Sequence, residues 1–224
     1  MLDWQALRGR FLVFDGPDGA GKSTALMPFA ARAHAAGLKV CQVREPGGTV
    51  VGERIRELLL DADADTQAPM EAVTEVLLFM ASRAQLVRQV IRPALRDGAL
   101  VLADRFIAST LAYQGTAGGV SMAEIRRVAD VALGGVWPDL TLVFDVDQAT
   151  ATRRLSPLLD RMEAKGAAYH ERVRKGFLLQ ANESPERFAV IDAAADVESV
   201  RRQTDLAVAA AVARWSSQQP MVSA

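Results

Sequence analysis

A glycine-rich segment near the start of the sequence has the residue types and the spacing that hold a polyphosphate. Residues 16–24 read Gly-Pro-Asp-Gly-Ala-Gly-Lys-Ser-Thr, which fits the pattern G-x-x-x-x-G-K-[ST]. Glycines let backbone N–H groups turn toward phosphate oxygens that a side chain would obstruct. Lys22 can then pair with β- and γ-phosphates, and Ser23 can offer its hydroxyl to Mg²⁺. The predicted nucleotide-binding residues of this loop are Gly16, Pro17, Asp18, Gly19, Ala20, Gly21, Lys22, Ser23 and Thr24.

An aspartate and an arginine follow a later apolar run and extend this phosphate chemistry. Asp104 and Arg105 come directly after Leu100–Ala103. An aspartate that leaves a strand beside a phosphate loop can hold Mg²⁺ through water. The planar guanidinium of the arginine can reach a second phosphate group, which indicates a phosphorylated acceptor. Because the sequence has neither the Asn-Lys-x-Asp guanine reader of GTPases nor the Asp-Glu strand end of motor ATPases, a nucleotide kinase is favoured.

Alternating strands and helices must position these residues. Apolar runs with little polar alternation predict strands that are covered on both faces, at Phe11–Asp15, Lys39–Val43, Leu100–Ala103, Leu140–Asp145 and Phe188–Ile191. Helical spacing separates these runs, first over Lys22–Ala36 and at greatest length over Met70–Asp97, so right-handed crossovers are expected. We therefore predict one three-layer α/β domain over residues 1–214, with a five-stranded, mainly parallel sheet surrounded by helices. A polar tail is predicted over residues 215–224.

Composition limits the partners of such a domain. The 224 residues include 26 basic and 27 acidic side chains, for a formal net charge of −1. This balance gives no overall attraction to nucleic acid or to anionic membranes. No stretch approaches the roughly 18–20 apolar residues of a membrane span. Cys41 is the only cysteine, so no intramolecular disulfide can form, and a reducing, cytoplasmic compartment is expected.

Several segments, taken in order, resemble bacterial thymidylate kinases from about Arg10 to Ala213. They are FLVFDGPDGAGKST, REPGGT (Arg44–Thr49), LLFMASRAQ (Leu77–Gln85), ADRFIASTLAYQG (Ala103–Gly115), PDLTLVFDV (Pro138–Val146) and LDRME (Leu159–Glu163). The resemblance implies a P-loop nucleoside monophosphate kinase fold and transfer of the γ-phosphoryl group from Mg-ATP to dTMP, typically by a homodimer. Two alternatives stay open: a kinase for dUMP or another pyrimidine monophosphate, and a non-catalytic ATP-binding switch of the same fold.

The resemblance also implies an acceptor site for the nucleotide that receives the phosphoryl group. Phe79 matches a residue that stacks on thymine, and Arg83 matches one that hydrogen-bonds its edge. Their i,i+4 spacing puts both on one helix face. Arg44 and Arg105 are predicted to hold the acceptor phosphate, and Asp18 to lie near the sugar 3′-hydroxyl. The remaining residues predicted for dTMP are Glu45, Pro46, Thr110, Tyr113, Gln114 and Glu163.

A mobile lid over residues 151–166 is the last feature that the resemblance implies. In the family, a transition-state arginine comes from the phosphate loop or from the lid. Since Gly19 and Ala20 occupy the loop positions, the lid must supply it, and Arg153, Arg154 and Arg161 are the candidates. The predicted catalytic residues are thus Asp18, Lys22, Arg105, Arg153 and Arg154, with Ser23 and Asp104 at the metal. The loop Ala193–Ala195, with Ala193 and Ala194 as its nucleotide-binding residues, is predicted to offer backbone groups and a flat apolar surface to adenine.

Overall fold

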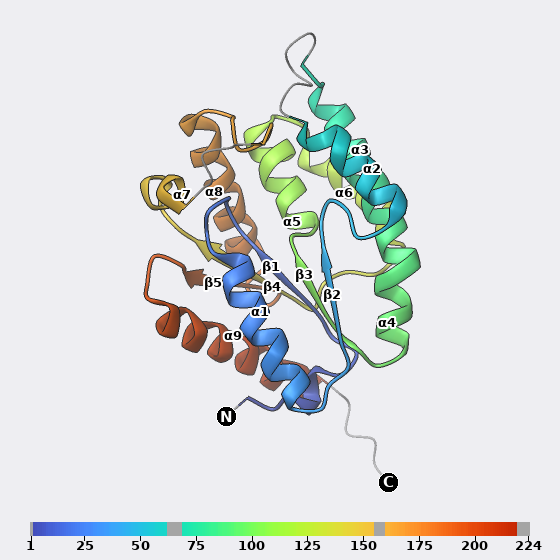
Figure 1. The fold of residues 1–224 in the computed structure, drawn as a ribbon, viewed down its shortest axis with the longest axis vertical. Coiled ribbons are helices and arrows are strands. Elements are labelled where there is room, and N and C mark those ends of the chain that lie inside the picture. Colours follow the sequence, from blue (N-terminus) through green and yellow to red (C-terminus); the bar gives the residue numbers. More distant parts are fainter. Residues whose placement is uncertain (1, 62–68, 155–159, 219–224) are drawn as a thin grey trace.

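Five parallel strands form one sheet in the order β2-β3-β1-β4-β5 (Figure 1). In this computed structural model, which describes residues 2–61, 69–154 and 160–218, the strands are β1 (Phe11–Asp15), β2 (Val40–Arg44), β3 (Leu100–Asp104), β4 (Leu140–Asp145) and β5 (Phe188–Asp192). Each strand was predicted to within one residue at either end. The expected mainly parallel α/β sheet is confirmed. In the described part of the chain, no helix is both long and apolar enough to cross a membrane.

Helices cover both faces of the sheet. They are α1 (Lys22–Ala35), α2 (Val50–Leu60), α3 (Ala72–Leu86), α4 (Arg92–Arg96), α5 (Ile107–Thr110), α6 (Met122–Leu133), α7 (Gln148–Arg154), α8 (Ala167–Glu183) and α9 (Val197–Gln218). Two π-helical segments, η2 (Val87–Ile91) and η3 (Leu111–Ala117), and a short 3₁₀ helix, η1 (Gln5–Leu7), complete the elements.

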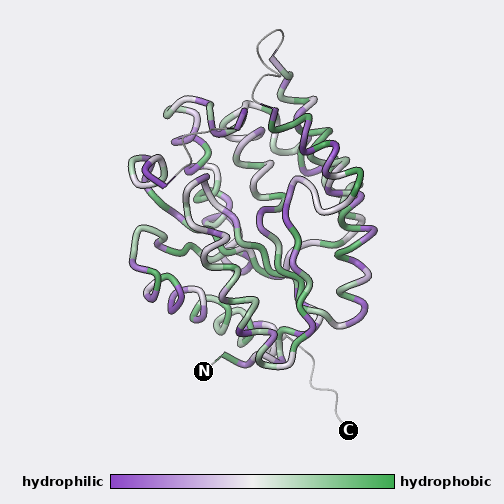
Figure 2. The backbone as a smooth tube through the Cα atoms, in the orientation of Figure 1, coloured by the Kyte–Doolittle hydropathy of each residue, from purple (hydrophilic) through white to green (hydrophobic). Residues whose placement is uncertain are grey.

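The side chains of β1 alternate between two hydrophobic clusters. Phe14 packs with Phe29 of α1 on the face that α9 also covers. Val13 packs on the opposite face with Ile125 of α6 and with residues of α3. Figure 2 shows hydrophobic colouring along the central strands, as expected for strands that are buried on both sides. The sheet is therefore the middle layer of the three that were predicted.

The long helical stretch predicted over residues 70–97 consists of α3, η2 and α4 in succession. Pro93 lies at the start of α4 and has no N–H to donate to the preceding turn. The wider π-helical turn of η2 directly before it accommodates this missing hydrogen bond. The chain thus stays helical through Pro93.

The C-terminal helix extends beyond the predicted domain boundary. α9 continues to Gln218, past the predicted end of the domain at residue 214. Trp215 packs against the core, and the Arg10 guanidinium lies 4.4 Å from the centroid of its ring. These contacts stabilise the last turns of the helix. Residues 219–224 lie outside the described residues.

The functional residues gather at the carboxyl edge of the sheet, because parallel strands all end there. Arg44 pairs in register with Asp104, and Asp104 with Phe14 on its other side. The loop that follows β1 and the loop that follows β3 are therefore neighbours. The predicted phosphate loop and the Asp104-Arg105 pair meet at this edge.

Candidate active site

The phosphate loop turns from β1 into α1. The Lys22 side chain folds over it, with Nζ donating to the carbonyl oxygens of Pro17 at 2.8 Å and Gly16 at 3.3 Å. Burial lowers the pKa of Lys22 to about 8. A Cβ at Gly16, where φ is +137°, would lie 2.4 Å from the Phe144 carbonyl oxygen, so the loop requires glycine at this position.

Helix α7 rests directly on this loop. A Cβ at Gly19 would lie 2.4 Å from the carbonyl oxygen of Ala151, the first residue of the predicted lid. Ala20 is buried in the core and lines a cavity beside the loop. Because α7 occupies the space above Gly19, this position has no room for a projecting arginine in the described conformation.

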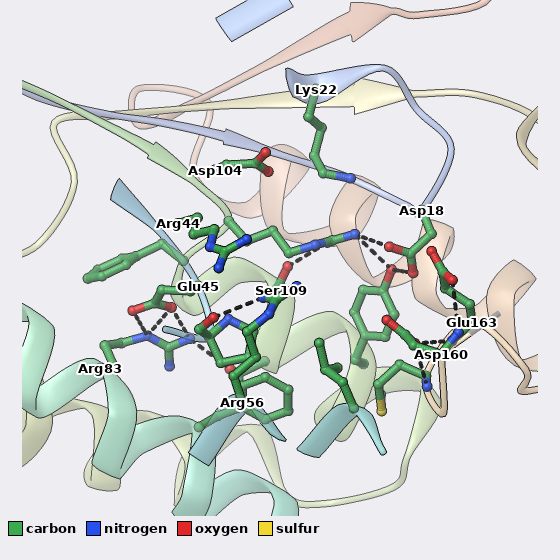
Figure 3. A pocket seen from close by; sticks show the side chains of 18 of the residues that line it. Asp18, Lys22, Arg44, Glu45, Arg56, Arg83, Asp104, Ser109, Asp160 and Glu163 are labelled. Atoms are coloured by element: carbon green, nitrogen blue, oxygen red, sulfur yellow. Dashed lines mark hydrogen bonds and ion pairs between the residues drawn. The ribbon is translucent and has the colours of Figure 1, made fainter. Parts of the chain in front are cut away.

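Ser23 and Asp104 form the oxygen pair that was predicted to hold a metal. The Ser23 hydroxyl donates to the Asp104 carboxylate at 2.5 Å. Figure 3 places Asp104 beside the Lys22 side chain, at the same end of the phosphate loop. Hard oxygen donors of this kind are the ligands that Mg²⁺ takes, usually one or two from the protein together with substrate phosphates. The donor set fits that ion.

A cavity of about 360 Å³, here called the acceptor cavity, opens next to Lys22 (Figure 3). Every residue predicted for dTMP lines it: Asp18, Arg44, Glu45, Pro46, Phe79, Arg83, Arg105, Thr110, Tyr113, Gln114 and Glu163. Lys22, Ser23 and Asp104 line it as well, so the predicted donor and acceptor residues share one space.

Arg105 is the centre of a charged network at the mouth of this cavity. It forms an ion pair with Asp18 and donates to the Gly16 carbonyl oxygen and the Ser109 hydroxyl, each at 2.9 Å. The Tyr113 hydroxyl donates to the other oxygen of Asp18 at 2.5 Å. Burial raises the pKa of Asp18, but Arg105 and Lys22 outweigh it, so that the pKa lies below its ordinary value. Asp18 thus positions both Arg105 and Tyr113, and it stays ionised at neutral pH.

Asp15 hydrogen-bonds to the segment that follows Arg105, and no role was predicted for it from the sequence. Its fully buried carboxylate accepts from the backbone N–H groups of Phe106 and Ser109, at 3.2 and 3.1 Å, and from the Ser109 hydroxyl at 2.7 Å. These bonds fix the turn that carries Arg105. The available signal was its place as the last residue of a buried strand, where an ionised side chain requires partners.

Arg83 and Glu45 form a buried pair at the inner end of the cavity. The Glu45 carboxylate accepts from Arg83 Nε at 2.7 Å and lies 2.6 Å from Nη2, while Nη2 also donates to the Thr110 hydroxyl at 3.1 Å. Arg83 is 1% exposed. Burial raises the pKa of Glu45 to about 7, against the opposing effect of Arg83. Phe79, one helical turn before Arg83, lines the same cavity, so the predicted shared helix face is present.

Arg56 of α2 also lines the acceptor cavity and was not predicted. Its Nη1 donates to the Pro46 carbonyl oxygen at 2.9 Å. Burial and then the nearby Arg44 lower its pKa, which indicates that like charges converge on this space. It lies one helical turn after Gly52, which the structure shows to be buried on α2, and no sequence pattern marked Arg56. Further lining residues without a predicted role are Leu60, Phe106, Ser109, Asp160 and Met162.

A second cavity of about 280 Å³ lies on the other side of the phosphate loop. Its lining includes Ala20, Gly21, Thr24 and Ala193 from the predicted nucleotide site. Ala193 and Ala195 of the predicted segment Ala193–Ala195 line it, whereas Ala194 does not. The Ala194 N–H donates to the Asp192 carboxylate, which turns this exposed residue away.

The candidate lid arginines lie in three different settings. Arg153 is exposed and donates to the Thr150 hydroxyl at 2.9 Å, whereas Arg154 lines the second cavity and donates to the Ala193 carbonyl oxygen at 2.9 Å. Arg161 is 4% exposed and bound to Glu75 at 2.7 Å. Of the described residues that line the acceptor cavity, none comes from α7. Residues 155–159 of the predicted lid lie outside the described residues.

A phosphate loop at the carboxyl edge of a parallel sheet, with a cavity on each side, defines a P-loop nucleotide kinase. The thymidylate kinase family model matches residues 14–204. A thymidylate kinase of Pseudomonas putida (strain GB-1) is 47% identical over 201 residues, covering 89% of this chain and 94% of that protein. One from Deinococcus radiodurans is 46% identical over 190 residues, covering 83% and 89%. The crystal structure of thymidylate kinase from Ehrlichia chaffeensis has a TM-score of 0.69 and 31% identity, covering 87% of this chain and 95% of that one. The chain belongs to the thymidylate kinase family.

Proposed function

We propose that the protein is an ATP-dependent nucleoside monophosphate kinase that transfers the γ-phosphoryl group of ATP to dTMP and forms dTDP and ADP. Its family membership supports this activity. The structural observation that carries it is the position of the acceptor cavity, which opens directly onto Lys22 of the phosphate loop. A nucleotide monophosphate in that cavity would have its phosphate beside the loop.

The base and the phosphate of dTMP contact opposite ends of the acceptor cavity in this proposal. At the inner end, Phe79 stacks on the pyrimidine, and Arg83 donates to its edge from a position held by Glu45 and Thr110. At the outer end, Arg105 and Arg44 bind the acceptor phosphate. Arg56 adds a further positive charge there.

The transfer step needs alignment and charge compensation rather than a protein nucleophile. The acceptor phosphate is already anionic near neutral pH, so its oxygen attacks the γ-phosphorus in line, and the bond to the β-phosphate oxygen breaks. Lys22 compensates charge on the donor side, and Arg105 on the acceptor side. Arg153 or Arg154 supplies a further cation from the lid. For that role α7 has to move from its described position, since Arg154 there contacts the Ala193 carbonyl oxygen.

Ser23 and Asp104 are the residues that would hold Mg²⁺. The ion, when bound with ATP, compensates the charge of the β- and γ-phosphates. The two protein oxygens hold and orient it at the end of the phosphate loop.

We also propose that the enzyme is a cytoplasmic homodimer. Large apolar side chains on the outer faces of α2 and α3, among them Leu58, Val73 and Leu77, are each more than half exposed, which favours a contact between two copies. The cytoplasm is favoured by its substrates, which are charged nucleotides of the cell interior, and by the single cysteine.

Product analysis tests the proposed reaction. Incubation with Mg-ATP and dTMP is expected to yield dTDP and ADP in equal amounts, measured by ion-exchange chromatography. The Lys22→Ala variant is expected to lose turnover, because it lacks the charge that pairs with the phosphates. ADP release without dTDP would indicate ATP hydrolysis and contradict the proposal.

A further inference from the structure

A buried carboxylate that belongs to no predicted site joins three separate segments. Glu75, in the first turn of α3, has a side chain that is 3% exposed. Its Oε1 accepts from Arg161 Nη1 at 2.7 Å and from Lys165 Nζ at 3.1 Å, and its Oε2 accepts from Gln114 Nε2 at 2.9 Å. Arg161 and Lys165 precede α8, and Gln114 lies on η3. One side chain thus links α3, the end of the predicted lid and the acceptor cavity.

The contact with Gln114 determines how that side chain presents its amide. An ionised carboxylate can only accept hydrogen bonds, so it must face the NH₂ group of the amide. This leaves Gln114 Oε1, an acceptor, as the amide atom that can serve a ligand. Gln114 is 1% exposed and lines the acceptor cavity.

The two cations give Glu75 the charge compensation that a buried carboxylate requires. They contact Oε1 and leave Oε2 to Gln114. The same carboxylate therefore has separate positions for the lid segment and for the base-reading side chain. A change at Lys165 and a change at Glu75 have different consequences for Gln114.

Pyrimidines differ at the atoms that such an amide reads. Thymine and uracil carry an N3–H donor beside the O4 acceptor, whereas cytosine has an N3 acceptor beside the N4 amino donor. Arg83, which only donates, complements O4, and Gln114 Oε1 complements N3–H. With the amide rotated, its NH₂ group would face the base instead and suit the N3 of cytosine.

We propose that Glu75 is a specificity-determining positioning residue, which holds the Gln114 amide so that the acceptor cavity selects a pyrimidine with an N3–H donor over cytosine. This inference rests on the proposed function, since it assigns the base to the end of the cavity near Gln114. Glu75 itself touches no substrate atom in this arrangement.

Acceptor selectivity in the Glu75→Gln variant tests the inference. Arg161 and Lys165 can only donate, so they keep the oxygen of a glutamine amide at the Oε1 position, and its NH₂ group then faces Gln114 and favours the rotated amide. The ratio of kcat/KM for dTMP to that for dCMP is expected to fall by about tenfold or more, with the KM for ATP unchanged. The matched control is Lys165→Met, which removes a partner of Oε1 but leaves the Oε2–Gln114 hydrogen bond in place, and it is expected to keep the wild-type ratio. An unchanged ratio in Glu75→Gln, or an equal fall in both variants, would overturn the inference.

A double variant keeps the test decisive when Glu75→Gln folds poorly, as measured by thermal melting. Glu75→Gln combined with Gln114→Glu exchanges the amide and the carboxylate, so position 114 again presents only an acceptor. It is expected to restore the preference for dTMP, and a double variant that uses dCMP as well as dTMP would contradict the inference. A wild-type enzyme without dTMP kinase activity would instead disprove the proposed function. A dTMP-active wild type with an unaltered Glu75→Gln ratio would disprove this inference alone.

Discussion

Arg105 is held in a backbone conformation that residues other than glycine rarely adopt. Its φ is +70°, in the left-handed region. The conformation is maintained on both sides, because its N–H donates to Phe14 at 3.0 Å and the next N–H donates to Asp15. Strain of this kind persists where the surroundings fix it, and it is frequent at functional sites. At this position it aims the guanidinium at Asp18 and the mouth of the acceptor cavity.

The pH dependence of ATP use is a prediction at the residue scale. The pKa of Lys22 in the free protein is about 8, so its charged form predominates below pH 8 and is lost as the pH rises above it. Since only the charged form pairs with the phosphates, kcat/KM for ATP is expected to fall about tenfold per pH unit above 8. Steady-state kinetics between roughly pH 6 and pH 10, about two units on either side of that pKa, would measure this fall.

The control for that profile is Lys22→Arg. A guanidinium stays protonated throughout this range, so the variant is expected to lose the alkaline fall even though its overall activity is lower. An identical alkaline fall in Lys22→Arg and wild type would contradict the assignment of the titration to Lys22.

At the scale of elements, the phosphate loop and α7 are in direct contact. The loop has glycine at position 19, where a Cβ would lie 2.4 Å from the Ala151 carbonyl oxygen of α7. The predicted lid and the proposed ATP site are therefore coupled through this contact. Any side chain at Gly19 has to displace α7, and with it Arg153 and Arg154.

Gly19→Ala is the corresponding prediction. The added Cβ strains a backbone with φ of +73° and meets the Ala151 carbonyl oxygen at 2.4 Å, so α7 has to shift. A displacement of about 1 Å in catalytic groups is expected to cost ~10²-fold in kcat. Gly98→Ala is the matched control, because Gly98 has a φ of +71° but open space around its Cβ position. It should lower the melting temperature without lowering kcat, whereas wild-type kcat in Gly19→Ala would rule out a functional contact.

The sheet and its crossovers were predictable at this scale, because apolar runs such as Leu140–Asp145 are too short and too uniformly apolar for other elements. The predicted acceptor residues also meet in one cavity, because the carboxyl ends of the parallel strands and one face of α3 lie next to each other. Asp15, Arg56 and Glu75 were missed because their roles depend on tertiary partners. Asp15 contacts residues more than 90 positions away in sequence. The position of Asp15 at the end of a buried strand indicates that its carboxylate needs partners, but no local pattern identifies those partners.

At the scale of the whole molecule, α2 and α3 present an apolar outer surface. Leu58, Val73 and Leu77 are 58%, 57% and 53% exposed, on two helices that pack side by side. Leu206 of α9 is 70% exposed, but α9 lies on the opposite face of the sheet (Figure 1). A charge introduced on α9 is therefore a control for a charge introduced on α3, because only the second should affect a contact between two copies.

Leu77→Glu is therefore expected to dissociate the proposed homodimer. Burying an unpaired carboxylate in an apolar interface is costly, so the variant should elute as a monomer of the 24.1 kDa chain. Light scattering after size exclusion would measure twice this mass for the wild type and for the control Leu206→Glu. A monomeric wild type would contradict the proposed assembly.

The central proposal is that the acceptor cavity, which opens onto Lys22, binds dTMP through Phe79 and the buried Arg83. A coupled assay of ADP release with dTMP, dUMP, dCMP, dAMP and dGMP tests it most directly. We expect the highest kcat/KM for dTMP and very low values for both purines, because Phe79 and Arg83 are proposed to bind a pyrimidine. Preference for a purine, or no release with any acceptor despite ATP binding, would contradict it.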